Sequence, residues 1–281
     1  MDISVVIPTY NRYEFLKRAL TSVYAQTHQP KKVIVVDDGS TDNTSQIKKD
    51  FPNIIYIYQK NKGVSSARNT GIKASTRSYI AFLDSDDEWL KDKLALHVAY
   101  HKQNPDILMS YTDEVWIRNG VEVKIPKKFK KLGVDIFKEN LEYCNIAPSS
   151  VCLHVELLKD VGLFDESLEV CEDYDLWLRI LVKYEVGLIN EKLITKYAGH
   201  EDQLSFKHWG MDRFRVESLE KLLMYKFPSL SFGTRKNKNK QTILSLKQTI
   251  TKKYKLLLKG AIKYDKIQDI KNYKDKLKLY E

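Results

Sequence analysis

Residues 79–87 decide the fold class, and they read Tyr79-Ile80-Ala81-Phe82-Leu83-Asp84-Ser85-Asp86-Asp87. The first five residues are apolar or aromatic and form a short run typical of a buried strand. Two carboxylates, those of Asp84 and Asp86, follow this strand at a sharp turn of the chain. Because ligands of open α/β sheets bind at the carboxyl ends of the strands, this turn is the first place to look for chemistry.

The residues around this stretch alternate between short β-branched runs and longer amphipathic segments, which is the pattern of βαβ units around a mostly parallel sheet. We expect further strands over residues 3–7, 33–36 and 54–58, and helices over residues 11–26, 63–74 and 90–103. Polar residues follow the four strands directly, in the segments Pro8-Thr9-Tyr10-Asn11-Arg12, Asp37-Asp38, Asn61-Lys62-Gly63 and Asp84-Ser85-Asp86. The sequence therefore predicts a ligand site at one edge of the sheet.

The pattern changes to antiparallel features after residue 105. Residues 111–118 and 121–125 are joined by Asn119-Gly120, a dipeptide that favours a type I′ hairpin turn. We divide the chain into an α/β domain over residues 1–228, a linker over residues 229–241 and a basic amphipathic helical tail over residues 242–281. Within the domain, the change of pattern separates a first half, residues 1–104, from a second half, residues 105–228.

The composition is that of an ordinary soluble globular protein, with 281 residues of which 43% are hydrophobic and 30% charged. The sequence contains no apolar run of 18 residues, and its first residues do not resemble a secretory signal, so we expect a cytoplasmic location. Cys144, Cys152 and Cys171 have no metal-ligand spacing and make a poor disulfide framework, which agrees with a reducing compartment.

The positive charge is concentrated in the tail. Residues 234–281 hold 15 basic and 4 acidic side chains, whereas the first 233 residues hold 32 and 33. Such a tail can pack on the body or on another copy of the chain in a homo-oligomer, or it can bind an anionic surface. An anionic membrane would place the protein on the inner face of the plasma membrane. The lack of aromatic stacking platforms and of a recognised motif argues against nucleic acid.

The Asp84-Ser85-Asp86 triplet offers hard oxygen ligands that suit Mg²⁺ or Mn²⁺. As a bare pattern, such a triplet is commonly a solvated turn or a helix cap. Its position after a buried strand, downstream of Asp37-Asp38, favours a metal site instead. A metal that bridges two phosphates neutralises the charge that grows on a diphosphate leaving group.

Five segments of the chain resemble one known family, the inverting, nucleotide-sugar-dependent glycosyltransferases of family 2, which have the GT-A fold. These segments are Val5-Val6-Ile7-Pro8-Thr9-Tyr10-Asn11-Arg12, Val35-Val36-Asp37-Asp38-Gly39-Ser40-Thr41-Asp42, Asn61-Lys62-Gly63-Val64-Ser65-Ser66-Ala67-Arg68-Asn69-Thr70-Gly71, Asp84-Ser85-Asp86-Asp87 and Glu172-Asp173-Tyr174-Asp175-Leu176-Trp177-Leu178-Arg179. The resemblance covers about residues 1–205. It implies a Rossmann-like mixed α/β sheet flanked by helices, with the tail as a helical extension. It also implies that residues 1–104 bind a nucleotide and residues 105–228 bind an acceptor.

The resemblance also implies a nucleotide pocket, for which we select Pro8, Thr9, Tyr10, Arg12, Asp37, Asp38, Arg68, Asp84 and Ser85. Asp38 would accept a hydrogen bond from the imide N–H of a uracil or thymine base. An ionised carboxylate is a suitable acceptor for this single N–H, which lies between two carbonyl groups. Asp37 can instead cap the following turn. The guanidinium of Arg68 suits either the base or the phosphates.

For the metal, the resemblance implies Asp86 together with Asp84, and His200 as a third ligand or a group near the diphosphate. For the acceptor-side base it implies the Glu172-Asp173 pair, and we select Asp173 over Glu172. Acidic residues also favour a first helical turn through the helix dipole alone. Trp177 lies four residues further on, and we expect it in the core rather than stacked on an acceptor sugar.

The sequence thus favours an inverting, metal-dependent transferase that moves a sugar from a nucleoside-diphosphate sugar, with a UDP-sugar preferred. The acceptor would be a glycan or a lipid-linked glycan in bacterial surface polysaccharide or lipo-oligosaccharide synthesis. One alternative is a noncatalytic nucleotide-sugar-binding or scaffold protein of the same fold, although binding alone has little use for an acceptor-side base. A nucleotidyltransferase would need a glycine-rich activating loop near residue 8, and a dehydrogenase would need Gly-x-Gly-x-x-Gly after the first strand.

Overall fold

The computed structural model describes residues 1–198, 210–224 and 236–280. Its strands are β1 (Ile3–Thr9), β2 (Lys32–Asp37), β3 (Ile55–Tyr58), β4 (Tyr79–Phe82), β5 (Glu88–Trp89), β6 (Met109–Arg118), β7 (Val121–Val123), β8 (Cys152–His154) and β9 (Gly187–Ala198). Its α-helices are α1 (Tyr13–Tyr24), α2 (Ile47–Asp50), α3 (Val64–Ala74), α4 (Lys93–Gln103), α5 (Ile136–Glu142), α6 (Val155–Val161), α7 (Glu172–Leu181), α9 (Asp212–Met224), α10 (Lys236–Lys263) and α11 (Ile267–Lys278).

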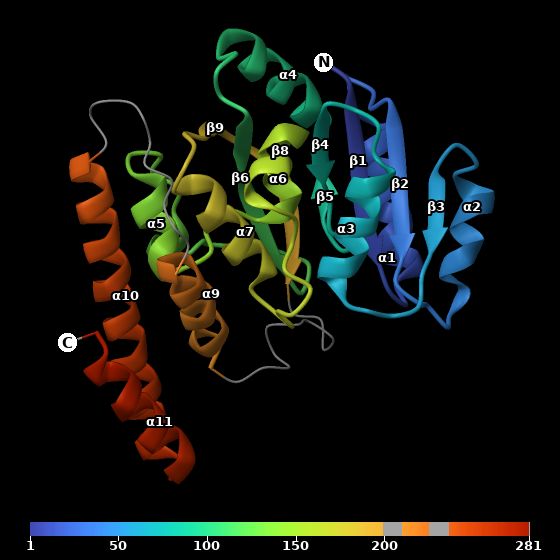
Figure 1. Ribbon diagram of the computed structural model, residues 1–281. Helices are drawn as coiled ribbons and strands as arrows, with labels where there is room; N and C mark the ends of the chain where they lie inside the picture. The colour runs from blue at the N-terminus through green and yellow to red at the C-terminus, as the bar shows by residue number, and fades with distance from the viewer. Residues whose placement is uncertain (199–209, 225–235, 281) are drawn as a thin grey trace.

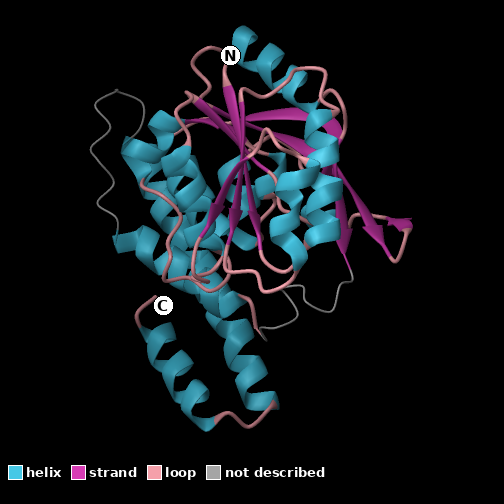
Figure 2. Ribbon diagram, turned by 90° about the vertical axis from the view of Figure 1, so that its right-hand side faces the viewer, coloured by secondary structure: helices cyan, strands magenta, loops and turns pink. Residues whose placement is uncertain are grey.

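One mixed sheet runs through the molecule in the order β3-β2-β1-β4-β8-β6-β9-β5, with β7 paired to β6 (Figure 1). The strands β3, β2, β1 and β4 are parallel, so their carboxyl ends meet at one edge. The short strand β8 is antiparallel to both β4 and β6, and it joins the two halves of the sheet. Helices cover both faces of the sheet (Figure 2). This is the mixed α/β sheet with flanking helices that the sequence predicts.

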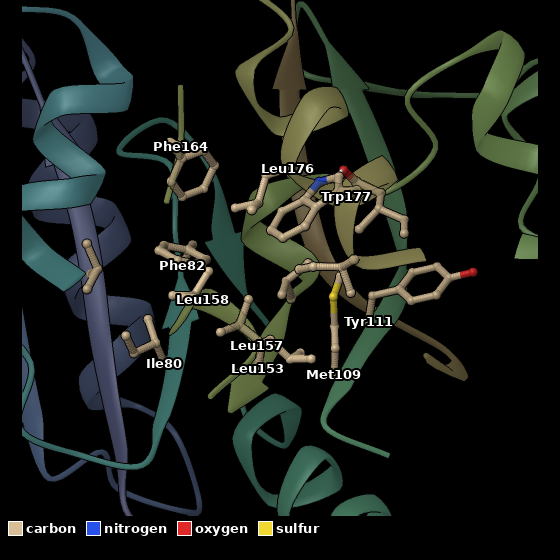
Figure 3. Close-up of a cluster of buried hydrophobic side chains, with 14 of the residues drawn as sticks. Ile80, Phe82, Met109, Tyr111, Leu153, Leu157, Leu158, Phe164, Leu176 and Trp177 are labelled. Atoms are coloured by element: carbon tan, nitrogen blue, oxygen red, sulfur yellow. Dashed lines mark hydrogen bonds between the residues drawn. The ribbon is translucent and has the colours of Figure 1, made fainter. Parts of the chain in front are cut away.

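Two apolar clusters fill the spaces between the sheet and its helices. Figure 3 shows the cluster on one face, where Phe82 of β4 and Met109 of β6 lie with Trp177 of α7. Trp177 is fully buried, and its indole N–H donates to the backbone oxygen of Ile146 at 2.9 Å. The expectation that Trp177 is a core residue is therefore confirmed.

Helix α3 approaches the sheet closely at Gly71. A Cβ atom at this position would lie 2.3 Å from Cγ1 of Val6 in β1, which is too close for a real contact. The absence of a side chain thus lets α3 rest on the parallel half of the sheet. This packing fixes the first turn of α3, which carries the residues of the Gly63–Arg68 segment at the carboxyl edge.

The tail forms a helical extension, as predicted, and its apolar stripe packs on the body. Leu246, Ile250 and Leu257 of α10 are buried in a third cluster that includes Tyr174 of α7 and Leu219 of α9. Helix α10 begins at Lys236, inside the segment expected as a linker. Residues 234–241 contain no glycine or proline to stop a helix, so the helix begins earlier than the sequence reading placed it.

Candidate active site

The loops that follow β1 and β2 are joined through Asn11, which adopts a left-handed backbone conformation with φ of 51°. The Asn11 side-chain oxygen accepts from the backbone N–H of Thr41 at 2.7 Å, and the Asn11 N–H donates to Ser40 Oγ at 2.8 Å. Asparagine tolerates this conformation better than most residues. The two loops predicted to hold a nucleotide therefore form one connected surface.

Asp37 and Asp38 lie at the end of β2 and have different hydrogen-bond partners. Asp37 Oδ1 accepts from the N–H of Ser40 at 2.8 Å, so Asp37 caps the following turn, which was the alternative reading of this residue. Asp38 accepts from the Gln59 side chain at 2.7 Å and from two backbone N–H groups, those of Lys62 at 3.0 Å and Gly63 at 2.8 Å. A carboxylate has about four lone-pair directions, so three bonds leave Asp38 room for one more donor.

Three buried polar atoms at this edge have no hydrogen-bond partner among the described residues. They are Thr9 Oγ1 at the end of β1, Ser65 Oγ in the first turn of α3 and Nε of Arg68. Leaving a buried polar atom unpaired costs free energy unless a ligand or water completes it. Of the other residues predicted on β1, Pro8 is buried inside the strand and Tyr10 is 46% exposed.

Arg68 connects the two halves of the site. Its Nη2 lies 2.7 Å from Asp84 Oδ1 at the end of β4, and its Nη1 lies 2.5 Å from Glu172 Oε1 at the start of α7. Burial lowers the pKa of Arg68, but Asp84 and Glu172 more than offset this, so the guanidinium stays charged. Burial raises the pKa of Glu172, and Arg68 counteracts that change. Motifs about ninety residues apart are thus held together by one side chain.

Arginine side chains pair with the carboxylates of the acidic turn after β4. Asp86 Oδ2 lies 2.8 Å from Nη1 of Arg12, while Asp84 pairs with Arg68. Ser85 is buried, and the buried Asp87 accepts from Ser149 Oγ at 2.6 Å. Burial, followed by the charges of Asp86 and Asp84, raises the pKa of Asp87.

The residues of this turn fit a divalent cation. Asp84 and Asp86 are both partly exposed, with 27% and 20% of their side chains accessible. Among the described residues, only one oxygen of each carboxylate accepts a side-chain hydrogen bond. Mg²⁺ and Mn²⁺ bind through one or two carboxylates plus phosphate and water oxygens, so two such free oxygens beside the turn provide the required donors. His200, the third predicted ligand, lies outside the described residues.

Lys196 of β9 is a site residue that the sequence reading missed. Burial lowers its pKa, but Glu114, Asp87, Asp84 and Asp173 together raise it above the ordinary value. The charge of Lys196 is therefore favoured by carboxylates from both halves of the site. The reading of residues 187–198 did not identify β9, so nothing pointed to a lysine at this edge.

The carboxylates predicted as the acceptor-side base begin α7 and differ in exposure. Glu172 is buried and paired with Arg68, whereas Asp173 is only half-buried. The residue before them, Cys171, has a left-handed backbone with φ of 65°, which turns the chain sharply into the helix. The thiol of Cys144 donates to Asp173 Oδ2 at 3.4 Å. Asp173 is therefore the accessible carboxylate of the pair.

A different group of possible metal ligands lies in the core. Ligand atoms of His97, His101 and Cys152 all lie within 4.8 Å of one another. The imidazole nitrogens of both histidines are already engaged, in a chain that runs from Lys93 through His97, Ser110 and His101 to the backbone oxygen of Ile107. Since Ile107 oxygen can only accept, every donor in the chain points the same way, and each ring is satisfied as a neutral imidazole. This group is consistent with a core hydrogen-bond network without a metal.

Among the helices that the structure describes, none is both long and apolar enough to cross a lipid bilayer.

Comparison with known proteins gives matches of two kinds. The family model described as glycosyl transferase family 2 matches residues 4–144. An uncharacterized glycosyltransferase of Rickettsia conorii is 35% identical over 195 residues, which are 68% of this chain and 32% of that protein. The Escherichia coli UDP-Glc:alpha-D-GlcNAc-diphosphoundecaprenol beta-1,3-glucosyltransferase WfaP is 31% identical over 200 residues, 69% of this chain and 76% of that protein. The match thus spans about a third of the length of the Rickettsia conorii protein and about three quarters of WfaP.

Solved structures share the fold. Residues 1–349 of Staphylococcus aureus TarS in complex with UDP-GlcNAc superpose with a TM-score of 0.67 at 20% identity, covering all of this chain and 91% of that one. The mannosyltransferase PcManGT of Pyrobaculum calidifontis, in complex with GDP-Man and Mn²⁺, gives a TM-score of 0.63 at 17% identity, covering 99% and 83%. The likeness at this level of identity establishes a common GT-A architecture.

Proposed function

The chain belongs to glycosyl transferase family 2, and from this premise we propose that it transfers a sugar from a UDP-sugar to a hydroxyl of a lipid-linked glycan, with inversion at the anomeric carbon. The proposal assigns donor binding to residues 1–104 and acceptor binding to residues 105–228. The observation that carries it is the double ion pair of Arg68. That pair joins the acidic turn after β4 to the start of α7, where Glu172 and Asp173 lie, so the groups assigned to donor and acceptor would share one site.

Support for a nucleotide comes from the carboxyl edge of the sheet. The connected loops after β1 and β2 leave Thr9 Oγ1 and Ser65 Oγ buried without partners, and Asp38 retains one acceptor direction. A uracil imide N–H would occupy that direction, because it needs one acceptor between two carbonyl groups. Uridine is preferred over guanosine on this basis, and the relative WfaP is named for a UDP-Glc donor.

The chemistry follows from the difference between the two carboxylates at the start of α7. Asp173 is half-buried and can reach an acceptor, whereas Glu172 is committed to Arg68. Asp173 would remove the proton of the acceptor hydroxyl as the hydroxyl oxygen attacks the anomeric carbon. The bond from that carbon to the phosphate oxygen breaks in the same displacement, and its electron pair leaves with the diphosphate. No covalent enzyme intermediate is needed.

Asp86 and Asp84 would hold a divalent cation, which when bound neutralises charge on the leaving diphosphate. This chain's own cations also surround that position. Arg12 contacts Asp86 at 2.8 Å, and the charges of Asp84, Asp87 and Asp173 help to raise the pKa of Lys196. These positive groups would hold the carboxylates in place before donor binding and would favour the charged diphosphate after it.

The acceptor class rests on the relatives. WfaP and the related Escherichia coli enzyme WfgD, which is 30% identical over 209 residues, are both named as glucosyltransferases acting on GlcNAc-diphosphoundecaprenol. We assign the same broad class, a diphospholipid-linked sugar, to the present chain. Residues 105–165, the first part of the acceptor half, carry no motif that identifies the sugar.

The decisive experiment compares Asp173→Asn with Glu172→Gln and with Glu185→Gln, an exposed acidic residue just beyond α7 that serves as a matched control. UDP release is measured with UDP-Glc or UDP-GlcNAc, Mn²⁺ and a short-chain GlcNAc-diphospholipid, and UDP affinity is measured separately by calorimetry. We expect Asp173→Asn to lower turnover at least 1,000-fold while UDP affinity stays within about three-fold, because loss of a general base affects the chemical step. The Glu185→Gln variant should match wild type.

An equal loss of turnover and UDP affinity in Asp173→Asn would remove the proposed role of Asp173. Tight UDP binding by the wild type with no transfer to any acceptor of this class would instead favour the noncatalytic nucleotide-sugar-binding protein.

A further inference from the structure

Helices α10 and α11 form a hairpin that is anchored to the body on one side. Glu220 of α9 accepts from the hydroxyl groups of Tyr254 at 2.8 Å and Tyr280 at 2.9 Å, and from the ammonium group of Lys276 at 3.0 Å. Lys253, which is almost fully buried, donates to Asp212 at 2.8 Å. These polar contacts add to the buried apolar stripe of α10. The hairpin therefore has a fixed direction relative to the body.

The turn of the hairpin exposes three large apolar side chains within six residues. Ile262 is 57% exposed, Tyr264 is 66% exposed and Ile267 is 75% exposed. The chain reverses beside them at Asp265, whose φ is 51°. Apolar side chains gathered at a protruding turn are unfavourable in water and mark a surface that meets an apolar partner.

Lysines surround this apolar turn. Lys259, Lys263, Lys271 and Lys274 are exposed on the two helices that meet there. The whole segment of residues 236–280 is also strongly positive, because it contains 14 lysines and only 3 aspartates. A partner that complements this region must combine negative charge with an apolar interior. An anionic phospholipid surface has this combination, whereas a nucleic acid has no apolar interior in which the exposed isoleucines could be buried.

The hairpin protrudes from the body in a direction that would let its turn meet a membrane surface. In both ribbon views the turn between α10 and α11 reaches beyond the rest of the molecule (Figures 1 and 2). Figure 1 shows that it does so at the end toward which β1 and β2 run, where the candidate active site lies. A membrane that meets the turn would therefore lie on the same side as the site.

We propose that residues 259–274, the hairpin tip, insert Ile262, Tyr264 and Ile267 into the headgroup region of an anionic phospholipid bilayer while the lysines contact lipid phosphates. This inference goes beyond the proposed transfer reaction and stands without it, because it rests only on the exposure, charge and direction of the hairpin. Long lysine side chains reach the phosphates while their stems cover apolar surface, so the two kinds of residue act together.

The test is sedimentation of the full chain with vesicles at 150 mM NaCl, comparing phosphatidylcholine alone with a 7:3 mixture of phosphatidylcholine and phosphatidylglycerol. The tip variant is Ile262→Ser/Tyr264→Ser/Ile267→Ser. The matched control is Val121→Ser/Leu132→Ser/Val134→Ser, which removes three other exposed apolar side chains. All six positions are on the surface, so both variants should fold, and their circular dichroism melting curves verify this.

We expect wild type to bind the phosphatidylglycerol vesicles at least 50-fold more tightly than phosphatidylcholine alone, since each lysine near an anionic surface contributes several-fold. The tip variant should bind at least 10-fold more weakly, and the control should match wild type. Equal binding of the tip variant and the control would overturn insertion, as would no preference for anionic vesicles. A wild-type dimer in light scattering that the tip variant converts to a monomer would assign the tip to a second copy of the chain instead.

Discussion

Replacing Arg68 with methionine tests whether one guanidinium holds the two halves of the site together. In wild type, burial raises the pKa of Glu172 and Arg68 counteracts that rise. In the variant without Arg68, the buried carboxylate of Glu172 has no counter-charge. It is therefore expected to be protonated, and so neutral, in the native state. The unfolded state keeps the ordinary pKa of 4.5. The native state of the variant therefore holds a proton that the unfolded state releases.

This difference sets the size of the effect. Each pH unit above 4.5 lowers the unfolding free energy of the variant by about 1.4 kcal/mol relative to wild type. The greatest loss of unfolding free energy is therefore about 3 kcal/mol at pH 7 and about 1 kcal/mol at pH 5. Because the variant's native state binds more protons, its unfolding free energy should fall relative to wild type as the pH rises from 5 to 7. Asp84 adds less, since 27% of its side chain is in contact with solvent.

Urea denaturation followed by tryptophan fluorescence at pH 5, 6 and 7, with chelator present, measures this dependence. The control is the same Arg68→Met change in a Glu172→Gln background, where no carboxylate remains to titrate and the loss should be independent of pH. A loss of the same size at pH 5 and pH 7 would refute the reasoning. So would a pH dependence that persists in the Glu172→Gln background.

Three further predictions concern stability. Burial lowers the pKa of Lys93 to about 7 from 10.5, so the unfolded state binds more protons above pH 7. In chemical denaturation, wild type should gain about 2 kcal/mol relative to Lys93→Met between pH 7 and pH 9, while the exposed Lys91→Met stays level with wild type. Gly71→Ala should lower the unfolding free energy by about 1–3 kcal/mol, measured in urea, because its Cβ meets Val6. Glu220→Ala should cost about 2 kcal/mol and make α11 sensitive to limited proteolysis, since three donors lose their acceptor.

Each of these has an outcome that would contradict it. A constant difference between wild type and Lys93→Met across pH 7–9 would mean that Lys93 is charged in the native state. Unchanged stability of Gly71→Ala would mean that α3 moves away from β1 without cost. Proteolysis of Glu220→Ala at the same rate as wild type would show that the apolar stripe alone anchors the hairpin.

The parallel half of the sheet could be predicted from sequence because its signals are local. Four short apolar runs alternate with amphipathic helices, and the predicted helix over residues 63–74 matches α3 to within one residue. The hairpin at Asn119-Gly120 also forms, with positive φ at both residues. In each case the residue pattern and the final packing favour the same local structure.

The second half of the sheet, expected to be antiparallel, was predicted poorly because its strands depend on distant partners, and its longest pairing, β6 with β9, is in fact parallel. The three-residue strand β8 has no periodicity to detect, and it exists because β4 and β6 supply its hydrogen bonds. The strand β9 is twelve residues long, but it carries Asn190, Glu191 and Lys192 in its middle, and its pairing with β6 is irregular at Asp113. A local reading therefore misses the element that brings Lys196 to the site.

Individual site residues show the same limit. The position of Asp38 after a strand could be read from the sequence, but its three donors come from residues 21 to 25 positions further on. The double pairing of Arg68 and the thiol of Cys144 beside Asp173 depend on tertiary packing, so no spacing rule could reveal them. Composition predicted which chemical groups are present, while the fold determined which of them meet.

The position of β8 in the middle of the sheet has a consequence for how the chain is made. A ribosome that has released the first hundred residues has produced β1 to β4, with one side of β4 still an open edge. The edge of β4 cannot pair until residues 152–154 of β8 are synthesised, and β6 cannot pair with β9 until residues 187–198 are synthesised. Because synthesis adds only about 5–20 residues each second, the nascent chain carries unpaired strands for several seconds. The time for which strand edges are exposed to aggregation therefore depends on how fast residues 105–198 are translated.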